Sequence, residues 1–308
     1  MSNNAAARTA LRSIRLGVSP LSWVNEVLED LGRDVSADAI LAEARAAGFS
    51  GVEMSRAFPE DADDLAALLS ARGLEFVSGW YSGFLAERSV TEELEAVREH
   101  ADRLKALGAA VMVYGECGHM ADEALDVPLS ARLTLTAEDM AAYGARLTEF
   151  AEKLRDEWGL VLVYHHHLMM VAESLNEVCA VMDNTGPAVS LLLDTGHAYA
   201  GGFDYALLLD KYAQRIRHIH LKDVRADVMQ QVRAEGISFN DGVRMGMFSI
   251  PGDGAVDFDP LARFLASGVY DGWLVVEAEQ DPAKAPPAET ASRAFRFVSD
   301  TILNRETV

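Results

Sequence analysis

Cysteine is scarce in this sequence, with only two residues among 308. Cys117 and Cys179 lie far apart and belong to no CxxC motif, so nothing in their placement indicates a disulfide framework. Sparse and unpaired cysteine is typical of proteins from a reducing compartment. We therefore expect a cytoplasmic location.

Positive charge and long apolar runs are also in short supply. The chain has 27 Lys and Arg residues against 48 Asp and Glu residues, which gives a formal net charge of −21 and an isoelectric point near 4.7. This charge repels polyanions, and no basic stripe opposes it, so a nucleic-acid partner is not expected. The N-terminus lacks the apolar core of a signal peptide, and no uncharged stretch approaches the ~18 residues that cross a bilayer, so no membrane partner is expected.

Short aliphatic or β-branched runs alternate along the chain with longer segments that have helical apolar spacing. This alternation is typical of βα units around a parallel sheet, and eight such units predict an α/β protein with a TIM (β/α)8 barrel. We expect a single domain over 1–308, in which residues 1–12 form a flexible extension. An open doubly wound sheet is the alternative. No GxGxxG motif follows any expected strand, however, and no organic cofactor is expected.

The expected strands are Ile14–Val18, Gly51–Met54, Glu75–Ser78, Ala110–Tyr114, Leu160–His165, Val189–Asp194, Ile216–Leu221 and Trp273–Glu277. Helices are predicted over 60–71, 92–107 and 137–158, each with a glycine just beyond its end that can terminate it. Thr91 is the expected N-cap of the second of these helices. The stretch 224–257 is expected to be a long irregular loop with one short polar helical piece between the seventh and eighth strands, and such loops usually carry function.

Histidines are concentrated at the ends of the expected strands. Six of the eight lie between His165 and His220. The apolar runs end as VLVYHHH, VSLLLDTGH and IRHIHLKD, and a fourth run, GWLVVEAE, ends in carboxylates. The active site of a TIM barrel lies at the carboxyl ends of its strands, so these side chains should meet at one mouth. Imidazole and carboxylate groups are ligands of divalent metals.

The clusters after the fifth and sixth strands each have two interpretations. Asp194 and His197 can both point into the mouth, or the aspartate caps the next helix and the histidine lies on the surface. In the triple histidine, strand alternation predicts that His165 and His167 share one direction and that His166 takes the other. A plain polar loop is the alternative for this run.

The clusters at the ends of the seventh and eighth strands contain ionisable residues that alternate along an otherwise apolar strand. His218, His220 and Lys222 share one face of the seventh strand, which favours a functional role over two core histidines. Glu277 and Glu279 also share a face, and ionised acids after an apolar run need a cationic partner. That partner is either a metal or a structural ion pair.

Three of these residues, Asp194, His220 and Glu277, come from different strands and predict a metal site without thiolates, with His165 as a fourth donor. Manganese, cobalt, iron, magnesium and zinc all suit such a set. Two further acids, Glu53 and Glu116, are each either a general base or an ion-pair partner. The aromatic and amide residues suited to hold a polyhydroxylated ring, unless they only pack in the core, are Trp23, Asn25, Trp80 and Tyr81.

With these residues identified, the chain resembles the xylose isomerase-like TIM-barrel superfamily of sugar isomerases and epimerases, and within it the inosose dehydratases of inositol catabolism. The resemblance covers nearly the whole chain and rests on the order and spacing of GVSPLSWVNE, GFSGVEMSRAFP, FVSGWYSG, YHHH, LLLDTGHAYAGG, HIHLKDVR, FSIPGDGAVDF and GWLVVEAEQDPAKAPP. It implies that Asp194, His220 and Glu277 bind one divalent metal. The superfamily usually has a glutamate, often a proton-transfer base in epimerases, where this chain has His165. This departure counts against epimerase chemistry and supports the dehydratase subgroup.

The resemblance implies a carbon–oxygen lyase that removes water from 2-keto-myo-inositol (inosose) and forms a trihydroxycyclohexane-1,2-dione. Manganese or cobalt is expected as the Lewis acid, with magnesium, iron or zinc as alternatives. A histidine of the 165–167 group, such as His165 or His167, or Glu116 is expected to transfer protons, while Lys222 and His197 contact substrate oxygens.

A metal-dependent ketose or keto-polyol isomerase or epimerase is the main alternative. A nuclease on the same barrel is opposed by the negative charge, and a sugar-binding protein would show no turnover. The expected partner is a small polyhydroxylated ketone, and a homo-oligomer is left open.

Overall fold

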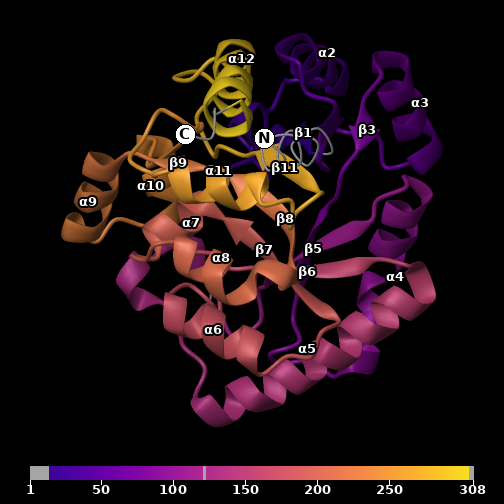
Figure 1. Ribbon diagram of the computed structural model, residues 1–308, viewed down its shortest axis with the longest axis vertical. Helices are drawn as coiled ribbons and strands as arrows, with labels where there is room; N and C mark the ends of the chain where they lie inside the picture. Colours follow the sequence, from indigo (N-terminus) through magenta and orange to yellow (C-terminus); the bar gives the residue numbers. More distant parts are fainter. Residues whose placement is uncertain (1–13, 121–122, 305–308) are drawn as a thin grey trace, which may run out of the picture.

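Parallel strands arranged in a ring lie at the centre of the molecule, in a computed structural model that describes residues 14–120 and 123–304 (Figure 1). Nine strands form one sheet in the order β3-β2-β1-β11-β8-β7-β6-β5-β4. Their bounds are β1 Arg15–Val18, β2 Gly51–Val52, β3 Glu75–Phe76, β4 Trp80–Gly83, β5 Val111–Glu116, β6 Val161–His165, β7 Val189–Asp194, β8 Ile216–Leu221 and β11 Trp273–Val276. The extension expected over 1–12 lies outside the described residues.

The sheet closes because the strands at its two ends belong to one stretch of chain. Only Val77–Gly79 separates β3 from β4. Toward β2, the Val77 amide donates to the Val52 carbonyl oxygen (2.9 Å). Toward β5, the Gly79 carbonyl oxygen accepts from the Val113 amide (3.1 Å). The predicted (β/α)8 barrel is therefore confirmed, with β3 and β4 as halves of its third strand. The prediction that this strand ends at Ser78 was wrong, because Trp80–Gly83 pairs with β5.

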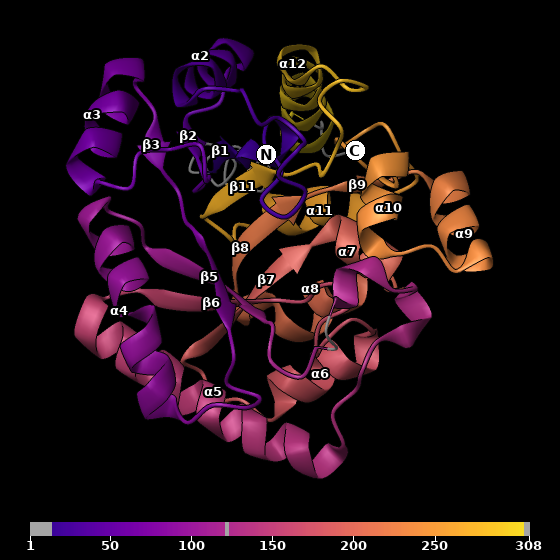
Figure 2. The ribbon, with the colours of Figure 1, turned by 180° about the vertical axis from the view of Figure 1, so that it is seen from behind.

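Helices surround the ring in both views (Figures 1 and 2). Their bounds are α2 Ala37–Ala47, α3 Ala62–Arg72, α4 Val90–Ala106, α5 Ala137–Trp158, α6 Leu175–Asp183, α7 Thr195–Ala200, α8 Ala206–Tyr212, α9 Ala226–Glu235, α10 Phe239–Met245, α11 Asp259–Ala266 and α12 Pro287–Phe297. Short 3₁₀ turns lie at Pro20–Ser22, Ala124–Asp126, Leu129–Ala131 and Ala213–Arg215, and a π-helical turn follows α12 at Val298–Leu303.

The ends of these helices follow from local hydrogen bonds. α4 begins after Ser89, whose hydroxyl accepts from the Glu92 amide (3.3 Å) while the Glu92 carboxylate accepts from the Ser89 amide (2.9 Å). Thr91 was therefore the wrong N-cap, because a capping box two residues earlier satisfies the first free amides. α5 has its predicted bounds, and it ends at Gly159, whose φ of 77° is a conformation that favours glycine.

The insertion between β8 and β11 is more regular than the sequence predicted. It contains α9, α10 and an antiparallel pair formed by β9 Asp223–Val224 and β10 Phe248–Ser249. Apolar side chains of this insertion, including Val232 and Phe239, form a second hydrophobic cluster together with residues of other loops, among them Leu28 and Leu129. The buried Asp223 carboxylate organises the loop that follows. It accepts hydrogen bonds of 2.8 to 3.0 Å from the backbone amides of Val224, Gly252, Gly254 and Val256.

Side chains fill the interior of the barrel below the strand ends. Trp273 and Val275 pack against Val77, and Gly51 leaves room for them because a Cβ there would lie 2.6 Å from Val77 and 2.7 Å from Trp273. A second cluster consists of Val111, Val113, Val163 and Leu192. The barrel is thus a packed core, and this packing positions the residues at the carboxyl ends of the strands.

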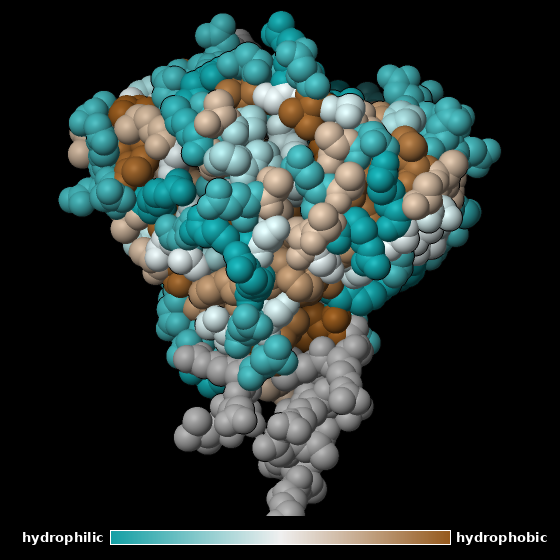
Figure 3. Space-filling model, turned by 90° about the horizontal axis from the view of Figure 1, so that it is seen from above, coloured by the Kyte–Doolittle hydropathy of each residue, from teal (hydrophilic) through white to brown (hydrophobic). Residues whose placement is uncertain are grey.

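On the face that Figure 3 shows, hydrophilic side chains protrude over most of the area and hydrophobic side chains lie between them in separate patches. Scattered apolar residues of this kind are usual on a protein surface. Within the described part of the chain, no helix combines the length and the apolar character needed to cross a membrane.

Candidate active site

A cavity of 380 Å³ opens at the carboxyl ends of the barrel strands. Its ionisable lining comes from several strands or the turns just after them. Glu53 follows β2, His165 ends β6, His220 lies on β8, and Glu277 and Glu279 follow β11. Side chains that are far apart in the sequence therefore meet at one mouth.

Four buried side chains at this mouth bring one donor atom each close together: His165, Asp194, His220 and Glu277, with all four atoms within 4.8 Å of one another. Asp194 Oδ2 lies 3.6 Å from His165 Nε2 and 3.8 Å from His220 Nδ1. His220 Nδ1 lies 3.2 Å from Glu277 Oε2. Two donors that bind one ion at about 2.0–2.2 Å are at most about 4.4 Å apart, so these spacings are compatible with a shared metal.

In both His165 and His220, the ring nitrogen that does not face the other donors makes a hydrogen bond with another group. His165 Nδ1 lies 2.8 Å from the His166 carbonyl oxygen, and because a carbonyl only accepts, Nδ1 carries the proton and Nε2 is free. His220 is turned the other way, with Nε2 3.1 Å from Glu53 Oε1 and Nδ1 toward the other donors. These partners fix each ring in the orientation that metal binding requires.

Asp194 has an unpartnered oxygen at the point where the four donors meet. Oδ1 accepts a hydrogen bond from the His197 amide (2.7 Å), so the residue also caps α7. Oδ2 is buried without a hydrogen-bond partner among the described residues, a state that costs free energy. Burial raises the pKa of Asp194, but the charge of Lys222 and the neighbouring His165 outweigh it and hold the pKa at about 2. An ionised carboxylate with one unpartnered oxygen fits a metal ligand.

Glu53 connects this cluster to a second histidine. Its Oε1 accepts hydrogen bonds from the Ser78 hydroxyl (2.5 Å), His218 Nε2 (2.9 Å) and His220 Nε2 (3.1 Å). Burial raises the pKa of Glu53, yet the charge of His220 and these hydrogen bonds hold it well below its usual range. Burial lowers the pKa of His220, but the charges of Glu53 and Glu277 raise it well above its usual value. An ion that binds Nδ1 must therefore displace a proton.

His167 lies at the cavity beside the four donors. Its Nδ1–H donates to the Leu168 carbonyl oxygen (2.6 Å), which leaves Nε2 unprotonated. Burial, the charge of His165 and the charge of Lys222 together lower the pKa of His167 to about 3. The imidazole is therefore neutral at physiological pH and has a free lone pair at Nε2. His165 and His167 both line the cavity, as strand alternation predicts.

Lys222 and His197, which we expected to contact substrate oxygens, lie behind the cavity wall and do not line it. Both are buried. The Lys222 ammonium donates to Glu279 Oε1 (2.8 Å) and pairs with Glu277 Oε2 (2.9 Å). These contacts make Lys222 a partner of the cavity carboxylates.

The residues expected to hold a sugar ring divide into two groups. Trp80 and Asn25 line the cavity. Trp23 does not, because its buried indole N–H points away and donates to Glu43 (2.7 Å). Tyr81 also lies away from the cavity, since it follows Trp80 on a strand and faces the opposite side.

Glu116 lies in the barrel wall and does not line the cavity. The carboxyl group is buried and contacts the Tyr114 hydroxyl (2.7 Å) and the Gly118 amide (2.8 Å). Burial raises the pKa of Glu116 to about 8, although these hydrogen bonds act in the opposite direction. At neutral pH the group is therefore mostly protonated, and the structure does not bring it to the proposed metal ligands.

Some cavity residues were missed in the sequence. Glu26, Met120, Met170 and Phe239 reach the cavity from loops or from the insertion, and no strand or helix periodicity distinguishes them. The length of the insertion was the one signal for Phe239, because long loops in barrels often cover an active site.

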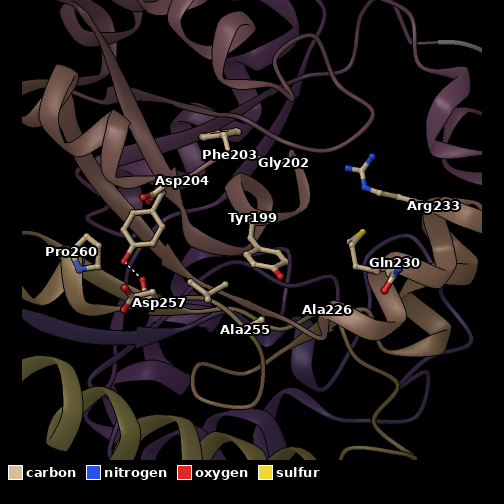
Figure 4. A pocket seen from close by; sticks show the side chains of 13 residues that line it. Tyr199, Gly202, Phe203, Asp204, Ala226, Gln230, Arg233, Ala255, Asp257 and Pro260 are labelled. Atoms are coloured by element: carbon tan, nitrogen blue, oxygen red, sulfur yellow. Dashed lines mark hydrogen bonds between the residues drawn. The ribbon is translucent and has the colours of Figure 1, made fainter.

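A larger hollow of 620 Å³ lies outside the barrel, between the α7–α8 region and α9 (Figure 4). Figure 4 shows Tyr199 near its centre, with Arg233 on one side and Asp257 on the other, so its charged groups do not converge. None of the described residues that we predicted as site residues lines this hollow. The smaller cavity at the barrel mouth is therefore the candidate active site.

Comparison with known proteins finds relatives along nearly the whole chain. Residues 41–301 match the family model described as xylose isomerase-like TIM barrel. The rhizopine catabolism protein MocC of Rhizobium meliloti is 41% identical over 280 residues, or 91% of this chain and 86% of that protein. The inosose dehydratase of Geobacillus thermodenitrificans (strain NG80-2) is 39% identical over 94% of this chain and 97% of its own. That of Clostridium beijerinckii (strain ATCC 51743 / NCIMB 8052) is 37% identical over 93% and 97%.

Solved structures share the barrel at much lower identity. The IOLI protein with a bound zinc atom aligns with a TM-score of 0.69 and 17% identity, over 96% of this chain and 100% of that one. An L-ribulose 3-epimerase aligns with a TM-score of 0.67 and 18% identity, over 94% and 95%. These structural similarities support the assignment of the fold as a TIM barrel. The predicted resemblance to the superfamily and to inosose dehydratases is confirmed by the matches to the family model and to the full-length relatives.

We predict that Glu53→Gln weakens metal binding. The amide oxygen lacks the negative charge of the carboxylate and accepts hydrogen bonds from His218 and His220 more weakly, so the His220 ring is held less firmly in its orientation. Loss of such a partner typically costs 10- to 100-fold in metal affinity. Calorimetric titration of metal-free protein with Mn²⁺ should show this rise in Kd. Glu75→Gln, at an exposed ion pair, is the control, and equal affinities for both variants would contradict the prediction.

The raised pKa of Glu116 predicts a stability that depends on pH. The folded state keeps a proton up to a pKa of about 8, whereas the unfolded chain releases it near 4.5. The contribution of this group should therefore fall by up to about 1.4 kcal/mol per pH unit between pH 5 and 8 and then level off. Glu116→Gln cannot ionise and should lack this decline. Urea midpoints of both proteins measure it, and a constant difference over this interval would refute it.

Proposed function

The chain belongs to the xylose isomerase-like TIM barrel family, and we propose that within this family it is a metal-dependent inosose dehydratase. The observation that carries the proposal is the cluster of His165, Asp194, His220 and Glu277 at the cavity of a chain whose full-length relatives include inosose dehydratases. The enzyme would be a carbon–oxygen lyase that converts 2-keto-myo-inositol to a trihydroxycyclohexane-1,2-dione and water.

The four donors would hold one divalent ion. Asp194 and Glu277 supply anionic oxygens, and His165 and His220 supply nitrogens already oriented by hydrogen bonds. This set suits manganese or cobalt, which we propose for the cell, with magnesium, iron and zinc as alternatives. When bound, the ion would act as a Lewis acid toward the ketone and an adjacent hydroxyl group.

His167 is the proton-transfer group that the geometry favours. The His167 side chain lines the cavity and its Nδ1 contacts the Leu168 carbonyl oxygen, while Glu116 is held in the barrel wall. We assign to Nε2 the proton from the carbon next to the ketone. The electron pair of that C–H bond forms the new double bond as the β-hydroxyl departs. As it departs, this hydroxyl takes the proton held by His167 and leaves as water, so one imidazole balances the proton transfers of the elimination. The elimination leaves an enol, which releases its hydroxyl proton while its ring carbon takes up a proton, and this tautomerisation gives the dione.

The cavity wall supplies the remaining contacts. Trp80 offers an aromatic face to the ring of the substrate, and Asn25 and Glu279 offer polar groups at the same cavity. We propose a small polyhydroxylated ketone as the partner that these residues recognise. We also propose that residues 1–308 work as one barrel domain in the cytoplasm, since the two cysteines form no paired pattern.

Incubation of Mn²⁺-loaded protein with inosose should give a product lighter by one water, with the near-ultraviolet absorbance of a dione. A ketose or keto-polyol isomerase or epimerase would instead give a product of unchanged mass. Mass spectrometry and absorbance distinguish these outcomes. Asp194→Asn, which loses an anionic donor, serves as the inactive control. Binding of inosose without loss of water would refute the proposal.

Replacement of the proposed base should lower the rate of the chemical step with little effect on the metal. We expect His167→Ala to reduce kcat by about 10²–10⁴-fold, the usual contribution of a general acid–base group. Mn²⁺ content, measured by elemental analysis, should stay near one ion per chain because His167 is not among the four donors. His119→Ala, at a partly exposed loop histidine, is the matched control. A kcat within threefold of wild type would exclude His167 as the base.

A further inference from the structure

Lys222 is a buried cation surrounded by groups that normally bind metals. Its side chain is 1% exposed. The ammonium lies 2.8 Å from Glu279 Oε1, 2.9 Å from Glu277 Oε2 and 2.9 Å from His197 Nε2. Asp194 Oδ2 is 3.8 Å away. Three carboxylates and one imidazole thus face a single nitrogen atom.

One of these groups also belongs to the proposed metal site. Glu277 Oε2 lies 2.9 Å from Lys222 Nζ and 3.2 Å from His220 Nδ1, so the same carboxylate oxygen contacts both positions. A carboxylate shared in this way is the usual bridge between two ions in two-metal sites, which are about 3.5–4 Å apart. His167, His197 and Glu279 form a further group whose ligand atoms lie within 4.8 Å of one another. The Lys222 ammonium lies between two of its members, His197 and Glu279.

The fold makes room for this lysine at a fixed place. The Thr195 hydroxyl and the Lys222 backbone exchange two hydrogen bonds, of 2.7 and 3.0 Å. Gly196 follows directly, and a Cβ there would lie 2.5 Å from Lys222 Cγ and 2.7 Å from its Cβ. The glycine of the DTGH sequence is therefore required for the lysine side chain to pass. The Phe248 ring, 4.7 Å from Nζ, covers the ammonium with an aromatic face.

We propose that the Lys222 ammonium takes the place of a second metal ion and thereby keeps the centre mononuclear. One divalent ion and one ammonium together balance the three charges of Asp194, Glu277 and Glu279. Without the lysine side chain, Glu277, Glu279 and His197 would form a second site for a divalent ion, with Glu277 as the bridge. Each donor would have to move by less than about 1 Å to reach a metal–ligand distance of about 2.0–2.3 Å.

The inference rests on the proposed metal site, and the metal content of wild type tests that site separately. Full-length proteins are stripped with a chelator, reloaded with Mn²⁺ alone and desalted. Bound manganese per chain is then counted by elemental analysis and native mass spectrometry. Wild type should hold one ion, and a wild type that holds none would refute the proposed metal site. Lys222→Ala should hold two ions.

Electron paramagnetic resonance provides a second readout. Two Mn²⁺ ions bridged by Glu277 should show exchange coupling, whereas a single ion gives the spectrum of isolated Mn²⁺. Lys222→Ala/Glu279→Gln, which lacks a second-site donor, should return to one ion. Lys222→Met, which loses the charge but still fills the space, should also hold one. Lys153→Ala on α5 is the matched surface control.

Loss of a buried cation can destabilise the fold. The number of bound ions must therefore be measured for folded molecules alone, even where part of the sample is unfolded. Native mass spectrometry counts ions in the folded population alone, and Lys222→Ser supplies a second small substitution with the same expected result. One ion per folded chain in both Lys222→Ala and Lys222→Ser, with one in wild type, would overturn the inference and leave the proposed metal site intact.

Discussion

Charge balance among buried groups at the barrel mouth is the constraint on which the rest of this structure depends. Glu53, Asp194, Glu277 and Glu279 are all buried, and an isolated carboxylate in such surroundings would be strongly destabilising. The protein meets this constraint with Lys222, with histidine N–H groups and with backbone amides. The mouth can therefore hold four acids close together only because each has a designated partner.

The barrel supplies those partners by geometry. Parallel strands place their carboxyl ends at one rim, so residues from β6, β7, β8 and the turn after β11 meet although they span more than a hundred positions of sequence. The packed interior below, with Trp273 seated against Gly51, fixes the height at which these side chains emerge. Local rules act at the same time, since Asp194 caps α7 with one oxygen and faces the donors with the other.

The sequence was sufficient to predict those helices and strands that have a clear apolar periodicity and distinct terminal residues. Helix α5 and strands β7 and β8 have their predicted bounds, because their apolar spacing and terminal residues are unambiguous. The split third strand was missed, since nothing in FVSGWYSG indicates that the chain changes partner between Phe76 and Trp80. For the insertion, the sequence indicated only one short helical piece where the structure has α9 and α10, because their apolar residues, such as Val232 and Phe239, pack with distant segments of the chain.

Side-chain direction was the harder problem at the site. Strand alternation correctly separates His165 and His167 from His166, but alternation alone cannot say whether Lys222 reaches solvent or an acid. Its contacts depend on Glu279, which arrives from another strand 57 residues later. Glu116 shows the same limit, because its surroundings are tyrosines contributed partly by the helix α5 and not by its own strand.

The pairing of β1 with β11 joins the first strand of the chain described by the structure to the last one. During synthesis, the barrel consequently cannot close until residues beyond Val276 have left the ribosome. Until then Lys222 and His220 lack Glu277, and Lys222 also lacks Glu279. The cluster of His165, Asp194, His220 and Glu277 and the closed barrel are thus completed by the same late segment of the chain.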